Sequence, residues 1–192
     1  MGKFKKIETS IDGVYIIEPT VFGDDRGYFM ETYSEAEFLE IGITNKFVQD
    51  NQSKSKKGVL RGLHFQKENS QAKLVRAIKG EVFDVAVDLR PGSKTYGKWE
   101  GVILSEENKK MFLIPKGFAH GFLVLTDEAE FTYKCDDVYN AQAEGGLAFD
   151  DKDVAIDWPL EGIGKENILL SEKDSKWPTL NELKNTDLFN NL

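Results

Sequence analysis

The feature that most limits the possible folds of this chain is a series of short segments rich in β-branched and aromatic residues. In segment 81–89, Phe83, Val85, Val87 and Leu89 alternate with acidic or small residues. This period of two residues is typical of a β-strand, whose successive side chains point to opposite faces. The segments expected to form strands are 14–18, 28–33, 47–53, 59–66, 73–79, 81–89, 98–104, 111–114, 121–125 and 130–135.

Helix signals are few. Ser34 and Glu37 form a capping-box pattern before a short apolar run, and Gly42 follows as a stop signal. Thr179 and Glu182 form a second such pattern near the C-terminus. Many short strands with few helices predict an all-β fold, a jelly-roll barrel or sandwich with a few short peripheral helices. One domain is expected over residues 1–192, with a barrel core at about 45–150 and a C-terminal segment at 160–192.

The composition excludes several classes of function. A formal net charge of −8 without any basic block argues against bulk binding to nucleic acid, although a few local cations suffice for a small anionic ligand. The single Cys135 has no partner for an internal disulfide, which favours a reducing compartment. No apolar signal region begins the chain, and no apolar run approaches the roughly 20 residues of a membrane span. We therefore expect a cytoplasmic protein without membrane contact.

Only two histidines are present, and each lies in a distinctive segment. His120 lies in Ile-Pro-Lys-Gly-Phe-Ala-His-Gly-Phe, which resembles the Pro-x-Gly-x-x-His motif of cupins and favours a cupin-type barrel. Many cupins bind a metal with a His-x-His pair from an earlier strand, but this chain has Leu-His-Phe-Gln around His64. The usual ligand cluster is incomplete, so no metal is expected. A histidine with a pKa of about 6.5 instead suits proton transfer near neutral pH.

The surroundings of His64 predict a pocket rather than a closed core. Arg61, Gln66 and Lys73 lie close to it in the sequence, and a closed core would not select these polar side chains. Arg61 and His64 would face opposite sides of an ideal strand. We therefore expect either a bulge at Gly62 that turns both inward, or a site shared with a second subunit.

The order of several segments resembles the dTDP-4-dehydrorhamnose 3,5-epimerase family from about residue 4 to residue 180. The segments are Val-Phe-Gly-Asp-Asp-Arg-Gly-Tyr-Phe-Met-Glu-Thr-Tyr (21–33), Phe-Val-Gln-Asp-Asn-Gln-Ser (47–53), Leu-Arg-Gly-Leu-His-Phe-Gln (60–66), Lys-Leu-Val-Arg (73–76), Gly-Glu-Val-Phe-Asp-Val-Ala-Val-Asp-Leu-Arg (80–90), the His120 segment, Phe-Thr-Tyr-Lys-Cys (131–135), Asp-Asp-Lys-Asp-Val-Ala-Ile-Asp-Trp-Pro (150–159) and Leu-Ser-Glu-Lys-Asp (170–174). The resemblance implies an isomerase that inverts C3 and C5 of dTDP-4-dehydro-6-deoxy-D-glucose, in dTDP-L-rhamnose synthesis.

The resemblance also implies the residues of the site. His64 falls on the base, Asp174 on its carboxylate partner and Tyr133 on the acid. Lys73 would stabilise the enolate oxygen, because epimerisation next to a ketone needs positive charge there. Substrate contacts are implied at Phe22, Arg26, Glu31, Gln49, Asn51, Arg61, Lys73, His120, Tyr139, Glu144 and Lys173. No cofactor is required, and a homodimer is implied.

Three other functions stay open at this point. The first is an epimerase of one carbon, C3 or C5, of a related nucleotide 4-keto-deoxysugar. The second is a sugar-binding module without turnover, although binding alone needs no opposed acid and base. The third is a metal-dependent cupin enzyme, which the histidine count disfavours.

Overall fold

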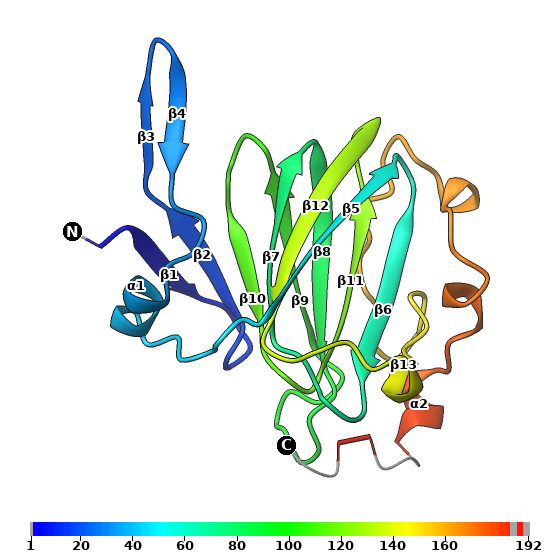
Figure 1. Cartoon of the computed structure of the whole chain (residues 1–192). Coiled ribbons are helices and arrows are strands. Elements are labelled where there is room, and N and C mark those ends of the chain that lie inside the picture. Colours follow the sequence, from blue (N-terminus) through cyan, green and yellow to red (C-terminus); the bar gives the residue numbers. More distant parts are fainter. Residues whose placement is uncertain (1, 185–187, 190–192) are drawn as a thin grey trace.

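Two antiparallel sheets face each other and form the body of the molecule (Figure 1). The computed structural model describes residues 2–184, 188 and 189. The six-stranded sheet has the order β1 (Phe4–Glu8), β2 (Tyr15–Pro19), β10 (Met111–Ile114), β7 (Lys73–Lys79), β12 (Glu128–Cys135) and β5 (Gln49–Lys56). The five-stranded sheet has the order β13 (Glu144–Gly146), β6 (Leu60–Gln66), β11 (Phe118–Val124), β8 (Glu81–Asp88) and β9 (Trp99–Ser105). The expected all-β jelly-roll class is confirmed.

The expected strands are confirmed, with ends that differ by at most three residues. Three further strands, β1, β3 (Val21–Asp24) and β13, carried no clear signal. β1 holds two lysines in five residues, and β13 holds two glycines in three. Such residues are depleted in strands, so these short segments form strands because a neighbouring strand offers hydrogen bonds.

The helices begin at the expected caps. α1 (Glu35–Glu40) is capped by Ser34, whose side chain accepts a hydrogen bond from the backbone N–H of Glu37. α2 (Leu180–Leu183) has both hydrogen bonds of the capping box between Thr179 and Glu182. Three short 3₁₀ helices are η1 (Ala141–Ala143), η2 (Lys165–Asn167) and η3 (Asp174–Lys176). None of the helices in the described part of the chain has the length and apolar character to cross a membrane.

Both faces of β8 are buried, so this strand packs against the other sheet on one side and against the C-terminal segment on the other. Val85 and Val87 pack with the C-terminal segment, while Val82 and Ala86 pack between the two sheets. Asp84 shares the inner face with Val82 and Ala86 and is wholly buried. The interior between the two sheets is therefore mostly apolar but also contains the buried carboxyl group of Asp84.

The C-terminal segment covers the outer face of the five-stranded sheet, along β6 and β11 (Figure 1, orange to red). Val154, Trp158, Leu180 and Leu183 are buried against that sheet. Burying side chains of this size removes much apolar surface from water and fixes the segment. As a result η3, which carries Asp174, lies against β6.

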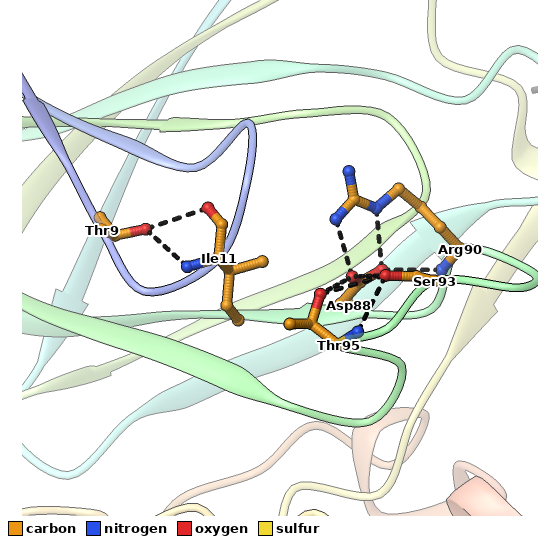
Figure 2. Close-up of polar contacts among 6 residues, drawn as sticks. All are labelled: Thr9, Ile11, Asp88, Arg90, Ser93 and Thr95. Carbon is orange, nitrogen blue, oxygen red and sulfur yellow. Dashed lines mark hydrogen bonds and ion pairs between the residues drawn. The ribbon is translucent and has the colours of Figure 1, made fainter.

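The turn after β8 is organised by Asp88, as Figure 2 shows. The wholly buried carboxylate accepts hydrogen bonds from the Arg90 guanidinium and from the hydroxyls of Ser93 and Thr95. Burial raises the pKa of Asp88, but these hydrogen bonds outweigh it and the pKa lies below its ordinary value. Asp88 is thus a buried charge with a full set of donors and a structural role.

A two-stranded hairpin, β3 with β4 (Gly27–Met30), projects from the barrel (Figure 1, upper left). Its apolar side chains lie in the open: Phe22 is 56% exposed, Tyr28 60% and Phe29 66%. Exposed apolar side chains grouped on one element mark a contact surface.

Candidate active site

His64 lies in the middle of β6, between β11 and β13. Its cross-strand partners are His120 on β11 and Gly146 on β13. The pairing of β6 with β11 shifts register between the partners of Arg61 and His64. Gly62 has a φ of +125°, and a Cβ there would lie 2.6 Å from the Cα of Gly121. The expected irregularity at Gly62 is therefore present, and only glycine fits this backbone.

Asp174 holds the imidazole of His64. Its Oδ1 lies 2.6 Å from His64 Nε2, which must carry a proton to donate to the carboxylate. Trp177 Nε1 donates to the same oxygen at 3.1 Å, and the Trp177 ring meets the His64 ring edge-on. The Asp174 side chain is 4% exposed, whereas that of His64 is 31% exposed. The ring is thus fixed on one side and open to solvent on the other, with Nδ1 as its unbonded nitrogen.

Asp174 is ionised at neutral pH. Burial raises the pKa of this carboxyl, but hydrogen bonds from His64, Trp177 and Ser171 outweigh burial and leave the pKa below its ordinary value. A lowered pKa means that the ionised carboxylate stabilises the folded state above about pH 4. This contribution is lost as the pH falls through the folded-state pKa.

The six-stranded sheet supplies the opposite wall. Tyr133 on β12 pairs with Val75 on β7 and Asn51 on β5, and Cys135 pairs with Lys73 and Gln49 in the same way. Residues two apart on a strand share a face, so these two rows lie on one side of the sheet. Tyr133, Lys73, Asn51 and Gln49 all line one cavity.

The cavity between the two walls has a volume of 310 Å³, and residues of both sheets line it. It is lined by Gln49, Asn51, His64, Phe65, Gln66, Gln71, Lys73, Tyr133, Tyr139 and Glu144. A second cavity of 530 Å³ lies on the other side of His64 and includes Arg61, Lys173 and Asp174. Arg61 and His64 line this second cavity together, and His64 also lines the first. The two residues therefore lie at one site within a single chain.

Burial shifts the pKa values of Lys73 and Tyr133 in opposite directions. Burial lowers the pKa of the Lys73 ammonium, while the charges of Cys135, Asp136 and Asp84 oppose this effect. Within the described residues, the side chain of Lys73 makes no hydrogen bond or ion pair. Burial raises the pKa of the Tyr133 phenol, so Tyr133 is protonated at neutral pH. The cavity therefore offers an amine without a side-chain partner in the described residues and a neutral phenol.

A network of polar contacts closes the rim. Tyr139 donates its backbone N–H to Gln49 Oε1 at 3.1 Å and its hydroxyl to Glu144 Oε2 at 3.3 Å. Glu144 Oε1 accepts a hydrogen bond from Lys173 Nζ at 2.6 Å. Tyr139 is 55% exposed, so its ring is free to stack on a flat ligand.

Besides His120, which is buried on β11 and lines neither cavity beside His64, three of the expected contact residues lie apart from the site. Phe22 and Arg26 belong to the projecting hairpin, where Arg26 forms hydrogen bonds with Asp24. Glu31 follows β4 and forms an ion pair with Lys3 at 2.6 Å. Within one chain, neither cavity beside His64 includes any of the three.

Sequence reasoning missed several residues of the site. Trp177 contacts both members of the His64–Asp174 pair, and it fits because Gly146 has no side chain: a Cβ there would lie 2.2 Å from the Trp177 ring. Gln71 lines the cavity without having been singled out. Asp84 bonds His120 inside the barrel. The alternation in 81–89 puts Asp84 on the face opposite Phe83 and Val85, and no local signal in the sequence indicates that Asp84 is buried.

Among the described residues, no group of three or more His, Cys, Asp or Glu side chains is placed so that it could hold a metal ion. The need for no cofactor stays a prediction. The cavity instead places an imidazole, a phenol and an amine, those of His64, Tyr133 and Lys73, around one volume. This set can remove a proton next to a carbonyl, hold the enolate and return a proton to the opposite face.

Comparison with known proteins gives a consistent picture. A family model described as dTDP-4-dehydrorhamnose 3,5-epimerase matches residues 8–182. A dTDP-4-dehydrorhamnose 3,5-epimerase of Methanothermobacter thermautotrophicus is 57% identical over 182 residues, which cover 95% of this chain and 97% of the relative.

Solved structures agree over nearly the whole chain. The crystal structure of dTDP-6-deoxy-D-glucose-3,5-epimerase from Legionella pneumophila, in complex with dTDP-4-keto-L-rhamnose, has a TM-score of 0.92 and 50% identity, and covers 98% of this chain and 99% of that chain. ChmJ, a 3'-monoepimerase from Streptomyces bikiniensis in complex with dTDP-quinovose, has a TM-score of 0.86 and 32% identity, and covers 94% of this chain and 90% of that chain.

Proposed function

Because the chain belongs to the dTDP-4-dehydrorhamnose 3,5-epimerase family, we propose that its cavity binds dTDP-4-dehydro-6-deoxy-D-glucose and that its own residues invert C3 and C5. The chain is an isomerase of nucleotide-linked sugars. The observation that supports the proposed site best is that His64 and Tyr133 line one cavity from opposite sheets. Inversion of a carbon requires a base and an acid on opposite faces of the substrate.

The proposed reaction begins with proton removal by Nδ1 of His64. Asp174 keeps the Nε2 proton in place and stabilises the imidazolium that forms. The electron pair of the broken C–H bond moves into the neighbouring keto group, and the ammonium of Lys73 stabilises the resulting enolate oxygen. Tyr133 then gives its phenol proton to the other face of the carbon. Solvent restores the proton of Tyr133 and removes that of His64 before the second carbon reacts.

The remaining residues are proposed to hold the nucleotide. Arg61 lies beside His64 and donates to Ser55 Oγ at 3.0 Å, which leaves part of its guanidinium for a diphosphate. Tyr139 would stack on the base, within reach of Glu144 and Lys173. Gln49 and Asn51 line the cavity between these two regions. A cluster of basic side chains at one mouth explains how a chain of net charge −8 binds an anion.

The second candidate is inversion of a single carbon. The specific observation in its favour is that a 3'-monoepimerase shares this fold with a TM-score of 0.86. The fold therefore does not fix the number of carbons inverted, which depends on how the sugar ring lies between His64 and Tyr133.

Product analysis tests the proposal against this candidate. The protein is incubated with dTDP-4-dehydro-6-deoxy-D-glucose, and proton couplings around the sugar ring are followed by NMR. Double inversion gives the L-configured 4-keto sugar. A product inverted at one carbon supports the second candidate, and an unchanged substrate contradicts both.

We predict that removal of metal ions leaves turnover unchanged. The His-x-His pair is missing from the sequence, and the proposed mechanism is complete with His64, Tyr133 and Lys73. The measurement is the epimerisation rate before and after dialysis against a chelator. Loss of activity that one divalent ion restores would overturn the prediction.

We also propose a homodimer in which the hairpin of one chain completes the site of the other. Phe22 and Arg26 are implied to contact the substrate, yet the hairpin lies apart from its own cavity. Its exposed Phe22, Tyr28 and Phe29 offer an apolar surface for a second copy. A closed two-fold dimer would exchange the hairpins symmetrically.

Mixed dimers test this exchange. Homodimers of Arg26→Ala and of His64→Ala each lack one necessary group in both sites, so both should turn over poorly. If the hairpins are exchanged, a mixed dimer has one intact site, and random mixing of the two variants restores about a quarter of wild-type turnover. Mixing leaves turnover low if each chain supplies its own Arg26, and that result would contradict the shared site.

Two expectations from the sequence stay proposals. A cytoplasmic location is supported by the single buried Cys135. A single functional unit over residues 1–192 is supported by the contact of the C-terminal segment with the barrel, through which Asp174 reaches His64.

A further inference from the structure

The barrel holds a second His–Asp pair, which the reaction described above does not use. Nε2 of His120 lies 2.9 Å from Oδ1 and 3.0 Å from Oδ2 of Asp84. Asp84 is 0% exposed and His120 8% exposed. In the described residues, His120 is the hydrogen-bond partner of this carboxylate, which can accept several bonds. Asp88 on the same strand is equally buried but has donors from three side chains.

The second pair lies next to the first. His120 and His64 are direct cross-strand partners on β11 and β6. The His120 ring stacks on Phe131 with the ring centres 6.3 Å apart, and Phe131 lies 6.2 Å from the Tyr133 ring. His120 therefore connects the wall of the base with the wall of the acid. Neither Asp84 nor His120 lines the cavities beside His64, whereas Lys73 and Tyr133 do, so Asp84 acts on the reaction only through its neighbours.

Asp84 also acts on the charge of Lys73. Burial raises the pKa of the Asp84 carboxyl, and the positive charges of His120 and Lys73 oppose this effect. In return, Asp84 is one of the negative charges that support the protonated form of Lys73. The two residues lie on different sheets, Asp84 on β8 and Lys73 on β7.

A purely structural role explains Asp84 poorly. Its neighbours on the inner face of β8 are Val82 and Ala86, both in the apolar interior cluster. Replacing a buried ionic pair by apolar side chains of similar volume is often neutral or stabilising. A carboxylate with a single donor at this position therefore costs stability, and the benefit must lie in what it does to His120 and Lys73.

We propose that Asp84 is a positioning residue for the reaction: it holds the proton of His120 on Nε2 and fixes the ring beside His64 and Phe131. The same charge keeps the Lys73 ammonium ready for the enolate oxygen. The inference rests on the proposed function, since it assigns Asp84 a part in that reaction.

The test combines NMR of isotope-labelled histidine with kinetics. The chain has two histidines, so the ring nitrogens are few, and His64→Ala identifies those of His120. In the wild type, Nε2 of His120 should carry a proton in a strong hydrogen bond. Asp84→Asn keeps the shape and removes the charge. It should weaken that hydrogen bond, leave the His64 signals in place and lower kcat about 10- to 100-fold, with little change in the affinity for dTDP.

Asp88→Asn is the matched control, because Asp88 is an equally buried aspartate on β8 outside the site. It should lower the melting temperature but leave the His120 signals and the kcat of the folded protein unchanged. Wild-type kcat in Asp84→Asn would overturn the proposal, as would a His120 Nε2 without a proton in the wild type. The NMR result needs no turnover, so an inactive wild type would contradict the proposed function and leave the proton of His120 measurable.

Discussion

His64→Ala should reduce turnover by about 10²- to 10⁴-fold, the range that a positioned general base contributes. The His64 side chain is 31% exposed and sits at the mouth of two cavities. Its loss removes the hydrogen bond to Asp174 and few packing contacts, so the fold should stay intact. Initial rates with dTDP-4-dehydro-6-deoxy-D-glucose measure the effect, and a circular dichroism melt checks the fold. Wild-type turnover in this variant would end the assignment of His64 as the base.

Asp174→Asn is the companion variant and should cost less than His64→Ala. The ring of His64 can still accept a proton, but the neutral amide stabilises the imidazolium less and can hold the wrong tautomer. The amide also keeps an oxygen for the hydrogen bond from Trp177. A larger loss in Asp174→Asn than in His64→Ala would mean that Asp174 does more than support the base.

Tyr133→Phe should separate proton removal from inversion. Only a hydroxyl is lost, and the ring keeps its contact with Phe131 at 6.2 Å. His64 and Lys73 remain, so the enolate should still form. Inversion should fall by about 10²- to 10⁴-fold, because no acid in a suitable position replaces the phenol. The variant should therefore exchange substrate hydrogen with solvent while it produces little L-configured product.

Two results would contradict this role. An equal loss of exchange and inversion would make Tyr133 a residue for binding or structure. Normal inversion would place the acid elsewhere, for example on an ordered water. Thr132→Val provides a control on the same strand: Thr132 lies beside Tyr133 with its side chain on the other face, so both rates should stay unchanged.

The strands and the pocket were predictable because both are local properties of the sequence. The alternation in 81–89 predicts β8, and the capping patterns at Ser34 and Thr179 predict α1 and α2. A bulge at Gly62 was one of two ways to bring Arg61 and His64 to one site, and the shift of register at this point bears it out. In contrast, the alternation pattern does not distinguish Tyr133 from any other aromatic residue of a strand. Only the family resemblance indicated that Tyr133 is the acid.

The rest depends on contacts between distant parts of the chain. Asp174 looks like a surface charge in the sequence, and it becomes buried because the C-terminal segment packs on the five-stranded sheet. Trp177 joins the site through the space beside Gly146, which no local pattern reveals. The hairpin carrying Arg26 lies apart from the cavity of its own chain, and only the proposed dimer would bring it to a site.

Incubation of the substrate in deuterated water tests the central claim most directly. If His64 removes protons next to the keto group and Tyr133 returns them from solvent, the L-configured product should carry deuterium at both C3 and C5. The same incubation with His64→Ala should show almost no deuterium at either carbon. Inversion without deuterium, or unchanged incorporation in His64→Ala, would contradict an enolate mechanism with His64 as its base.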